Sequence, residues 1–397
     1  MSRNWVWLGL LLAACGGNKD TDIVGTDASQ NLDVDGDGFK SNSGDCNDDD
    51  ATVFPNAVDA FGDAIDQNCD GLDGTDQDRD GFASDETGGP DCDDTNPEFN
   101  PDARDQGWDA IDQDCDGFDR LDWKEVTAGE QHTCAISTLD ELRCWGDDDL
   151  LQVTNTPAGK FKLVDAGEGF TCAIGLDDTL ACWGDDEYDQ VSAAPSGAFL
   201  AVAAGRRHAC AITVAGLAVC WGDNSSYESS PVGTSAKVSD ISAGDSFSCA
   251  ITESDGEVIC WGEDDDNQVG LAPTQLDYKG IAAGKTHACG IRDDLGVYCW
   301  GSNIYGQLAP ANDAGPYSSL SSSSNFTCAI ESGNFVRCWG EGGDGQTIEP
   351  EGSFVKVAAG WAHACAISGP FGTITCWGEN SREQNDVPVG EIPSEGT

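Results

Sequence analysis

The sequence feature that most constrains the fold is a repeated pair of cysteines that ends in Trp-Gly. The segment TCAISTLDELRCWG at 133–146 is followed by TCAIGLDDTLACWG at 171–184 and by five further variants. A period of 38 to 40 residues, present seven times, predicts a β-propeller or a solenoid. The tryptophans that mark the period are Trp145, Trp183, Trp221, Trp261, Trp300, Trp339 and Trp377.

Each unit has the composition of three short strands. Its apolar runs are rich in Val, Ile, Cys and Thr and are bounded by Gly and Asp, which is typical of strands, and no unit has the periodicity of a helix. Seven such units suit a closed ring, because closure removes the exposed sheet edges that an open stack would leave. We therefore predict an all-β chain in which residues 122–385 form a seven-bladed β-propeller, followed by a tail at 386–397.

The spacing of the cysteines predicts local disulfides. In a hairpin whose turn is centred on Leu139, Cys134 and Cys144 lie opposite each other, with Cα atoms about 4.5–5.5 Å apart. We expect the tryptophans to pack between neighbouring blades. Apart from Cys15, the eighteen cysteines are predicted to pair as Cys46–Cys69, Cys92–Cys115, Cys134–Cys144, Cys172–Cys182, Cys210–Cys220, Cys249–Cys260, Cys289–Cys299, Cys328–Cys338 and Cys365–Cys376.

The N-terminus has the features of an export signal. Arg3 precedes the apolar run WVWLGLLLAA, which is too short to span a bilayer but fits a secretory signal peptide. The run ends in LAAC, which resembles the bacterial lipobox. The resemblance implies a signal peptide at 1–14, lipidation of Cys15 and a cell-envelope location, at the outer membrane or cell surface, with the lipid as the only anchor. We expect residues 15–30, which are small and polar, to form a flexible tether. The alternative is an ordinary signal peptide that leaves Cys15 unpaired.

Residues 31–121 contain two copies of an acidic segment. The whole chain has 72 Asp and Glu against 19 Lys and Arg, a formal charge of −53, which argues against nucleic-acid binding and favours cations or basic partners. The pattern D-x-[DN]-x-D-G occurs four times in this segment and resembles the first half of an EF-hand loop, in which alternate oxygen ligands converge before a sharp glycine turn. Position twelve carries no glutamate, so the closing ligand must come from elsewhere. Without neutralisation, such a charge density keeps a chain disordered.

An all-oxygen donor set favours calcium over zinc or copper, and the segment contains no histidine. The segment resembles the MopE-type metal-binding motif of exported bacterial proteins; copper is known for that group but is not expected here. We predict a small, disulfide-bonded, loop-rich module that depends on structural calcium. The predicted ligands are Asp33, Asp35, Asp37, Asp45, Asp48, Asp66, Asn68, Asp70, Asp73, Asp76, Asp78, Asp80, Asp91, Asp94, Asp112, Asp114, Asp116 and Asp119.

The repeat units carry a second resemblance. The pattern AAGxxHxCAI…CWG, together with NIYGQL at 303–308, resembles the regulator-of-chromosome-condensation repeat. The short period is similar to that of compact secreted propellers such as β-lactamase-inhibitor protein II. Exchange-factor activity, known for the nuclear branch, is not expected in an acidic, exported chain without an inserted wedge. The sixth unit has SSSSNF at 321–326 in place of AAGxxH, so its first strand is the least regular.

We interpret the propeller as a non-catalytic platform that binds an envelope or extracellular protein. The four histidines occupy a position that other units fill with Phe, which indicates packing, and paired cysteines cannot act as nucleophiles. A carbohydrate-binding surface module is the alternative, and an enzyme with its site on the rim is the third hypothesis. The acidic loops after Trp-Gly should gather on one rim, where the candidate binding residues are Asp147, Asp148, Asp185, Tyr188, Tyr227, Asp264 and Tyr305.

Overall fold

The computed structural model describes residues 33–103, 105, 111–116, 122–231, 236–274, 277–309, 315–369 and 372–388. The chain separates into two compact units, one of which includes residues 33–103 and the other residues 122–388. The expected signal peptide, Cys15 and the tether lie outside the described residues. Within the described part of the chain, no helix is both long and apolar enough to cross a bilayer.

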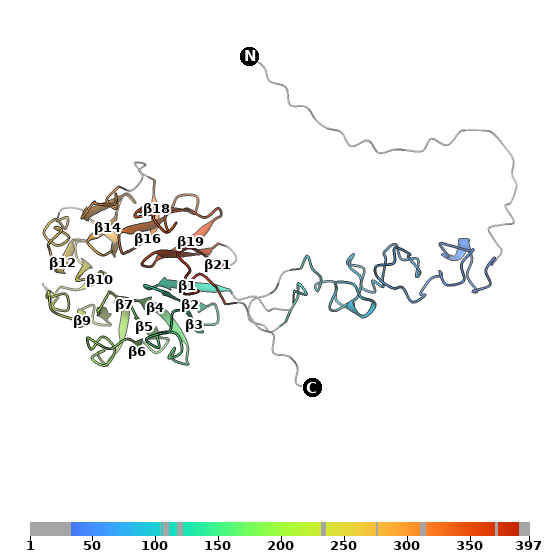
Figure 1. Cartoon of the computed structure of the whole chain (residues 1–397), viewed down its shortest axis with the longest axis horizontal. Coiled ribbons are helices and arrows are strands. Elements are labelled where there is room, and N and C mark those ends of the chain that lie inside the picture. The colour runs from blue at the N-terminus through green and yellow to red at the C-terminus, as the bar shows by residue number, and fades with distance from the viewer. Residues whose placement is uncertain are drawn as a thin grey trace, which may run out of the picture. The chain divides into compact units, whose positions relative to one another are not determined.

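The C-terminal unit confirms the predicted propeller. Its described residues form seven antiparallel sheets of three strands, each with its strands in sequence order. The first strands of the sheets surround the centre of the ring and the third strands lie at its periphery (Figure 1). The blades are β1 (Trp123–Ala128), β2 (His132–Ser137) and β3 (Leu142–Gly146); β4 (Phe161–Ala166), β5 (Phe170–Gly175) and β6 (Leu180–Gly184); β7 (Phe199–Ala204), β8 (His208–Thr213) and β9 (Ala218–Gly222); β10 (Val238–Ala243), β11 (Phe247–Thr252) and β12 (Val258–Gly262); β13 (Tyr278–Ala283), β14 (His287–Arg292) and β15 (Val297–Gly301); β16 (Tyr317–Ser323), β17 (Phe326–Glu331) and β18 (Phe335–Gly340); and β19 (Phe354–Ala359), β20 (His363–Ser368) and β21 (Ile374–Gly378).

The acidic unit has little regular structure. Its described residues form two short 3₁₀ helices, η2 (Ser41–Ser43) and η3 (Asp85–Thr87), joined by turns. Its buried apolar side chains in the described residues are those of Val53 and Ala83. A chain segment with so small an apolar core needs another source of stability.

Disulfides join the predicted cysteine pairs in both units. In the blades, the paired cysteines are direct cross-strand partners, as with Cys134 and Cys144. Their Cα atoms are 4.0–4.1 Å apart, closer than the expected 4.5–5.5 Å, because the two residues are directly opposed and the short bridge draws the backbones together. The two bridges of the acidic unit, Cys46–Cys69 and Cys92–Cys115, span 5.7 and 5.6 Å between Cα atoms.

The sixth blade differs from the others at the turn between its first two strands. β16 extends to Ser323, which pairs directly with Phe326, so the turn consists of only Ser324 and Asn325. Ser324 has φ of 37°. The unusual SSSSNF sequence therefore still forms the inner strand, and its turn encloses two residues, as between Gly129 and His132 in the first blade.

The hydrophobic core lies between consecutive blades. Trp183 of the second blade packs with Cys134 and Ile136 of the first, and its indole Nε1 donates to the Gln152 carbonyl oxygen at 2.8 Å. Each of the other blades repeats this contact with the loop that precedes it. The equivalent pairs are Trp221–Gln190, Trp261–Glu228, Trp300–Gln268, Trp339–Gln307 and Trp377–Gln346, at 2.8–2.9 Å.

The same contact closes the ring. Trp145 of the first blade donates to the Gln384 carbonyl oxygen at 3.0 Å, and that oxygen also accepts the Thr133 hydroxyl at 2.9 Å. β1 contacts β19 and β20, so the last blade lies beside the first (Figure 1). The final loop therefore closes the ring by making with the first blade the contact that every other loop makes with the blade after it, and no strand is exchanged between blades.

The four histidines connect blades through hydrogen bonds. His132 Nε2 lies 2.7 Å from the Thr171 hydroxyl of the next blade, and the same arrangement recurs at 2.7–2.9 Å for the other three. Where a blade has Phe instead, the next blade has Ala, which packs in the same cluster as the ring. Around the ring the pairs are His132–Thr171, Phe170–Ala209, His208–Ser248, Phe247–Ala288, His287–Thr327, Phe326–Ala364 and His363–Thr133.

These histidines make the propeller sensitive to acid. Burial lowers the pKa of His132 to about 3 and that of His208, His287 and His363 to about 4, from 6.5. At these four sites the unfolded chain therefore binds more protons than the folded chain between pH 6.5 and about 4, and the histidine contribution to stability falls as the pH is lowered through that window. We expect the variant with His208→Phe and Ser248→Ala, which copies the Phe170–Ala209 pair, to lose less stability there.

Melting temperatures of the wild type and this double variant, at pH 8 and at pH 4.5, measure the effect. Burial raises the pKa of Asp165 and Asp240 to about 6, so these two carboxyls contribute more stability as the pH is lowered. Both proteins contain them, and the difference between the two proteins therefore measures the histidine alone. A decrease in melting temperature on acidification that is the same in both proteins would contradict the prediction.

Candidate metal centres and interaction face

In each copy of the acidic segment, the first D-x-D-x-D-G loop holds its own backbone with both carboxylate oxygens of its first aspartate and one oxygen of each of the next two. Asp33 accepts from the Gly36 and Gly38 amides, Asp35 from the Asp37 amide and Asp37 from the Phe39 amide, at 2.7–3.2 Å. Gly38 has φ of 100°, a conformation that favours glycine and lets the chain turn after the third aspartate. The loop is thereby shaped so that the second oxygens face inward.

Those second oxygens converge without hydrogen-bond donors. Asp35 Oδ2, Asp37 Oδ2 and Asp45 Oδ2 are buried and have no hydrogen-bond partner among the described residues. Asp35, Asp45 and Asp48 each place a carboxylate oxygen within 4.8 Å of the other two. Burial raises the pKa of Asp35, and the charges of Asp37 and Asp45 add to the increase. Buried, unpaired carboxylate oxygens are costly, and a cation among them would remove that cost.

The second copy repeats this cluster. Asp78, Asp91 and Asp94 bring their carboxylate oxygens within 4.8 Å of one another, and Asp76, Asp78 and Asp80 do the same. Asp91 is fully buried, and its Oδ2, like Asp78 Oδ2, has no hydrogen-bond partner in the described part of the chain. Burial raises the pKa of Asp91, with a further contribution from the charges of Asp80, Asp78 and Asp94.

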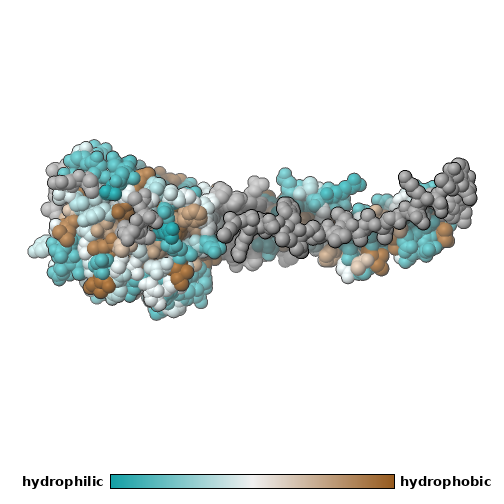
Figure 2. All heavy atoms as spheres, turned by 90° about the horizontal axis from the view of Figure 1, so that it is seen from above, coloured by the Kyte–Doolittle hydropathy of each residue, from teal (hydrophilic) through white to brown (hydrophobic). Residues whose placement is uncertain are grey.

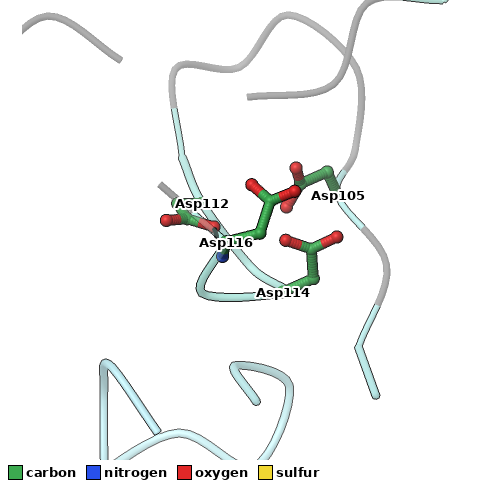
Figure 3. Close-up of side chains that lie close together, drawn as sticks. All are labelled: Asp105, Asp112, Asp114 and Asp116. Atoms are coloured by element: carbon green, nitrogen blue, oxygen red, sulfur yellow. Dashed lines mark hydrogen bonds between the residues drawn. The ribbon is translucent and has the colours of Figure 1, made fainter. Parts of the chain in front are cut away.

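A further cluster includes a residue that the sequence pattern did not predict. Asp105, Asp112, Asp114 and Asp116 each place a carboxylate oxygen within 4.8 Å of the others (Figure 3). Asp105 lies outside every D-x-D pattern. Asp59 is its counterpart in the first copy, since each follows the first cysteine of its copy by thirteen residues. This repetition between copies is the signal that could have identified both residues.

The residues of the first copy that correspond in sequence to this cluster are Asp59, Asp66, Asn68 and Asp70, whose carboxylates do not form such a group among the described residues. Asp59 is fully buried, and neither of its carboxylate oxygens has a hydrogen-bond partner among the described residues. Burial raises its pKa, and the charge of Asp66 adds to the increase. Asp66 holds the loop through the Asp70 and Gly71 amides at 3.1 and 3.0 Å.

The predicted closing ligands have different positions. Asp45, Asp48, Asp91 and Asp94 lie in the clusters described above. Asp73 instead accepts from the Gly62 and Ala64 amides at 3.1 and 3.0 Å and belongs to no carboxylate cluster found in the described residues. Asp119 lies outside the described residues. The clustered ligand atoms are all carboxylate oxygens, which favour a hard cation.

The propeller presents the loops after its third strands on one face. The turn after each first strand lies at the same end of the blade, as shown by the Asp147 amide, which donates to the Gln131 carbonyl at 2.9 Å. We call this surface, made of the turns after the first strands and the loops after Trp-Gly, the loop face. At its centre opens a channel of about 420 Å³, lined by the first strands of all seven blades.

Several predicted rim residues hold the loops of this face together. Asp148 Oδ1 accepts from the Val153 and Thr154 amides at 2.8 and 2.9 Å. Asp147 Oδ2 accepts from the Gln152 side chain at 2.8 Å. Asp185 and Asp264 have the same roles in later loops, toward Gln190 and toward the Val269 and Gly270 amides. These carboxylates are therefore part of the loop structure as well as of the surface.

The aromatic and aliphatic residues of the loop face differ in exposure. The Arg207 guanidinium lies 4.5 Å from the centre of the Tyr188 ring, which is half-buried. Tyr227 is 74% exposed and Tyr305 is 50% exposed. Figure 2 shows apolar residues dispersed among hydrophilic ones over one side of the propeller. Loop residues that the sequence reasoning missed, and that are also exposed, are Leu150, Leu151, Leu271, Ile304 and Ile348.

Two family matches agree with the two units. The family described as "Regulator of chromosome condensation (RCC1) repeat" matches residues 123–152, 199–228, 238–268 and 278–307. The family described as "Putative metal-binding motif", of the MopE type, matches residues 45–74 and 91–119. No curated protein sequence compared with this chain gives a significant match.

Solved propellers resemble the C-terminal unit. The CRINKLY WD40 ectodomain of the Arabidopsis thaliana receptor kinase ACR4 is 24% identical, with a TM-score of 0.58 over 68% of this chain and 99% of that one. The ectodomain of the Physcomitrella patens receptor kinase CR4 is also 24% identical, with a TM-score of 0.57 over 65% and 74%. Yeast RCC1 (Prp20), solved with Kap60, is 14% identical, with a TM-score of 0.51 over 60% and 78%.

At these identities the structural likeness concerns the fold. The repeat match, the seven three-stranded sheets and the propeller neighbours all describe one architecture for the C-terminal unit. The motif match and the carboxylate clusters describe the N-terminal one. The chain thus consists of a regulator-of-chromosome-condensation-repeat β-propeller preceded by two copies of the MopE-type metal-binding motif.

Proposed function

We propose that this protein is a non-catalytic lipoprotein of the bacterial cell envelope, displayed at the outer membrane or cell surface. Its propeller would be a platform that binds another envelope or extracellular protein. Support for the location comes from the apolar run that ends in LAAC at 12–15 and from eighteen paired cysteines, which suit an oxidising compartment. The acidic unit would be a spacer between the lipid and the platform.

Calcium is the cation that the acidic unit fits best. The carboxylate oxygens of Asp35, Asp45 and Asp48, and those of Asp78, Asp91 and Asp94, would hold it. Residues 31–121 contain no histidine, and their cysteines are paired in disulfides, so neither imidazole nor thiolate is available as a ligand. The ion would supply positive charge to a segment that otherwise repels itself. We propose a structural role, because the unit has almost no apolar core of its own.

The exposure of Tyr227 and Ile304 on the loop face is the observation that carries the proposed protein partner. Tyr227 is 74% and Ile304 is 79% exposed, and both project from loops whose backbones are fixed by internal hydrogen bonds. Rigid loops with single apolar anchors on a charged surface suit protein recognition. The yeast RCC1 propeller is itself solved with a protein, Kap60.

Cross-linking on intact cells tests this function with one variant for each face. The loop-face variant carries Tyr227→Ser and Ile304→Ser, and the matched control carries Leu176→Ser and Val214→Ser, which are exposed in the turns between second and third strands. We expect only the loop-face variant to lose a discrete cross-linked protein, by about tenfold or more, as for the loss of two interface anchors. Loss in the control alone would contradict the choice of face, and unchanged cross-linking in both would contradict the platform function.

A carbohydrate ligand is the second candidate, favoured by the exposed rings of Tyr227 and Tyr305. Aromatic rings on fixed loops can stack against sugars as well as against protein side chains. A glycan array probed with the full chain, with and without calcium, distinguishes the two. Binding of a defined glycan that is lost in the Tyr227→Ser variant would favour the carbohydrate over the protein partner.

A further inference from the structure

The mouth of the central channel on the loop face is formed by one equivalent residue from every blade. Each follows the glycine, or in the sixth blade the serine, that ends the inner strand, and all seven line the channel. The backbones around them are nearly uniform, since the amide of one such residue donates to the turn carbonyl of the next blade in most blades. The side chains, in contrast, all differ except for one repeated glutamate: they are Glu130, Glu168, Arg206, Asp245, Lys285, Ser324 and Trp361.

In one arc of this ring, the charged side chains form ion pairs with one another. Arg206 Nε lies 2.8 Å from Glu168 Oε2 and 3.3 Å from Asp245 Oδ1. Arg207, behind the ring, lies 3.7 Å from the same Glu168 oxygen. The guanidinium of Arg206 is thus shared by two carboxylates, and this arc has no charge left for a ligand.

The opposite arc holds two charged side chains, Lys285 and Glu130, that form no close ion pair among the described residues. Lys285 lies 5.0 Å from the centre of the Trp361 ring, and no carboxylate of the described residues lies within 4.0 Å of its ammonium group. Glu130 is next to Trp361 in the ring, because the Trp361 amide donates to the Gly129 carbonyl at 3.1 Å, and Glu130 likewise has no ion pair in the described part of the chain. Burial raises the pKa of Glu130, and the charge of Glu168 adds to the increase.

Below the mouth, the channel is lined by small residues together with polar ones such as Asp165, Asp240 and Ser242. The first strands of six blades each end in an alanine that lines the channel, and the interior is about 420 Å³, within the range of small-ligand sites. These strand-end alanines are Ala128, Ala166, Ala204, Ala243, Ala283 and Ala359. An ammonium group, an indole, a carboxylate and a cavity of mixed polarity therefore meet at one opening.

We propose that this mouth binds a small zwitterion of the amino-acid or dipeptide class, with an apolar side chain that packs against Trp361. Lys285 holds the carboxylate of the ligand, Glu130 holds its ammonium group, and the apolar side chain lies against the Trp361 indole at the opening of the channel. Each of these two charges of the mouth then has a partner of opposite sign, and the ligand's ammonium lies next to an aromatic face and a half-buried carboxylate. This site depends neither on a protein partner nor on calcium.

Isothermal titration calorimetry of the full chain tests the proposal with matched probes. Ala-Phe carries both charges, Ala-Phe-amide only the ammonium, and N-acetyl-Ala-Phe only the carboxylate. We expect Ala-Phe to bind and each capped form to bind about tenfold or more weakly, as for loss of one charged hydrogen bond. Phenylalanine is the fourth probe: tighter binding of phenylalanine than of Ala-Phe identifies a free amino acid as the ligand, and the reverse identifies a peptide.

Two variants assign the two ends of the ligand. Glu130→Gln should abolish the preference for Ala-Phe over N-acetyl-Ala-Phe, and Lys285→Met should abolish the preference over Ala-Phe-amide. Glu187→Gln, on an exposed loop of the same face, is the control and should bind like the wild type. Melting curves establish that all three variants are folded. Absence of binding by every probe, or equal binding of the three Ala-Phe forms by the wild type, overturns the proposal.

Discussion

Removal of calcium is expected to expose residues 33–116 to protease while the propeller stays folded. The acidic unit buries carboxylate oxygens without donors at Asp35, Asp37 and Asp45 and at Asp78 and Asp91, and its described residues bury only Val53 and Ala83 as apolar side chains. At a free calcium concentration of about 100 times Kd, each site would stabilise the unit by about 2.7 kcal/mol, and two or more sites add. Without the ion, that stabilisation is lost and the charges repel.

Limited proteolysis of the full chain with and without chelator, read by mass spectrometry, measures this effect. Asp45→Asn and Asp91→Asn should each raise protease sensitivity of the acidic unit in saturating calcium, because each removes a buried ligand charge. Asp49→Asn is the control, since Asp49 is exposed and belongs to no carboxylate cluster among the described residues. Cleavage at the same rate with and without chelator would show that the unit does not need the ion.

A chain that ends at Gly378 is expected to melt roughly 10 °C or more below the complete propeller. Truncation removes the Gln384 carbonyl, which accepts from Trp145 and Thr133, and exposes the first-blade face of Trp145. Two buried donors left unsatisfied cost about 1–3 kcal/mol each, and each kcal/mol lowers the melting temperature of a domain this size by about 2–4 °C. The lost contact of Val387 with the same cluster adds to the effect.

Differential scanning calorimetry of the truncated chain checks this prediction. The control is a chain that ends at residue 388, which keeps the whole final loop and should melt like the full protein. The Arg382 ion pairs with Asp147 and Asp149 are also lost at Gly378, but they are partly exposed and contribute little. Equal melting temperatures for the two truncations would show that the ring does not depend on its last loop.

The fold could be predicted from the sequence because its strongest constraints are local. The Trp-Gly period fixes the number of units, and cysteines ten or eleven residues apart fix the register of each hairpin, as in Cys134 opposite Cys144. The contacts between blades could not be predicted in the same way. The partner of Trp145 is Gln384, and the partner of Thr133 is His363, more than 200 residues away in the sequence.

The candidate sites were predicted in part for the same reason. The D-x-[DN]-x-D-G loops are local patterns, and Asp35, Asp45 and Asp48 meet as expected. Asp59 and Asp105 belong to no such local pattern. Each comes alone from a neighbouring turn, so no short motif in the sequence marks it. On the loop face, the sequence alone indicates that Asp148 and Asp264 are surface carboxylates. In the folded loops, backbone amides that are brought near them donate to their oxygens.

The histidine–hydroxyl and phenylalanine–alanine pairs determine how such a ring can change in size. Perfect alternation is impossible in a circle with an odd number of members, and the seam falls where His363 meets Thr133. Excising the second and third blades together would leave His132 facing Ser248, a matched junction, whereas excising the second blade alone would set His132 against Ala209. The unit that could be added to or removed from this ring is therefore a pair of consecutive blades. A change of two blades keeps each histidine opposite a hydroxyl and each phenylalanine opposite an alanine.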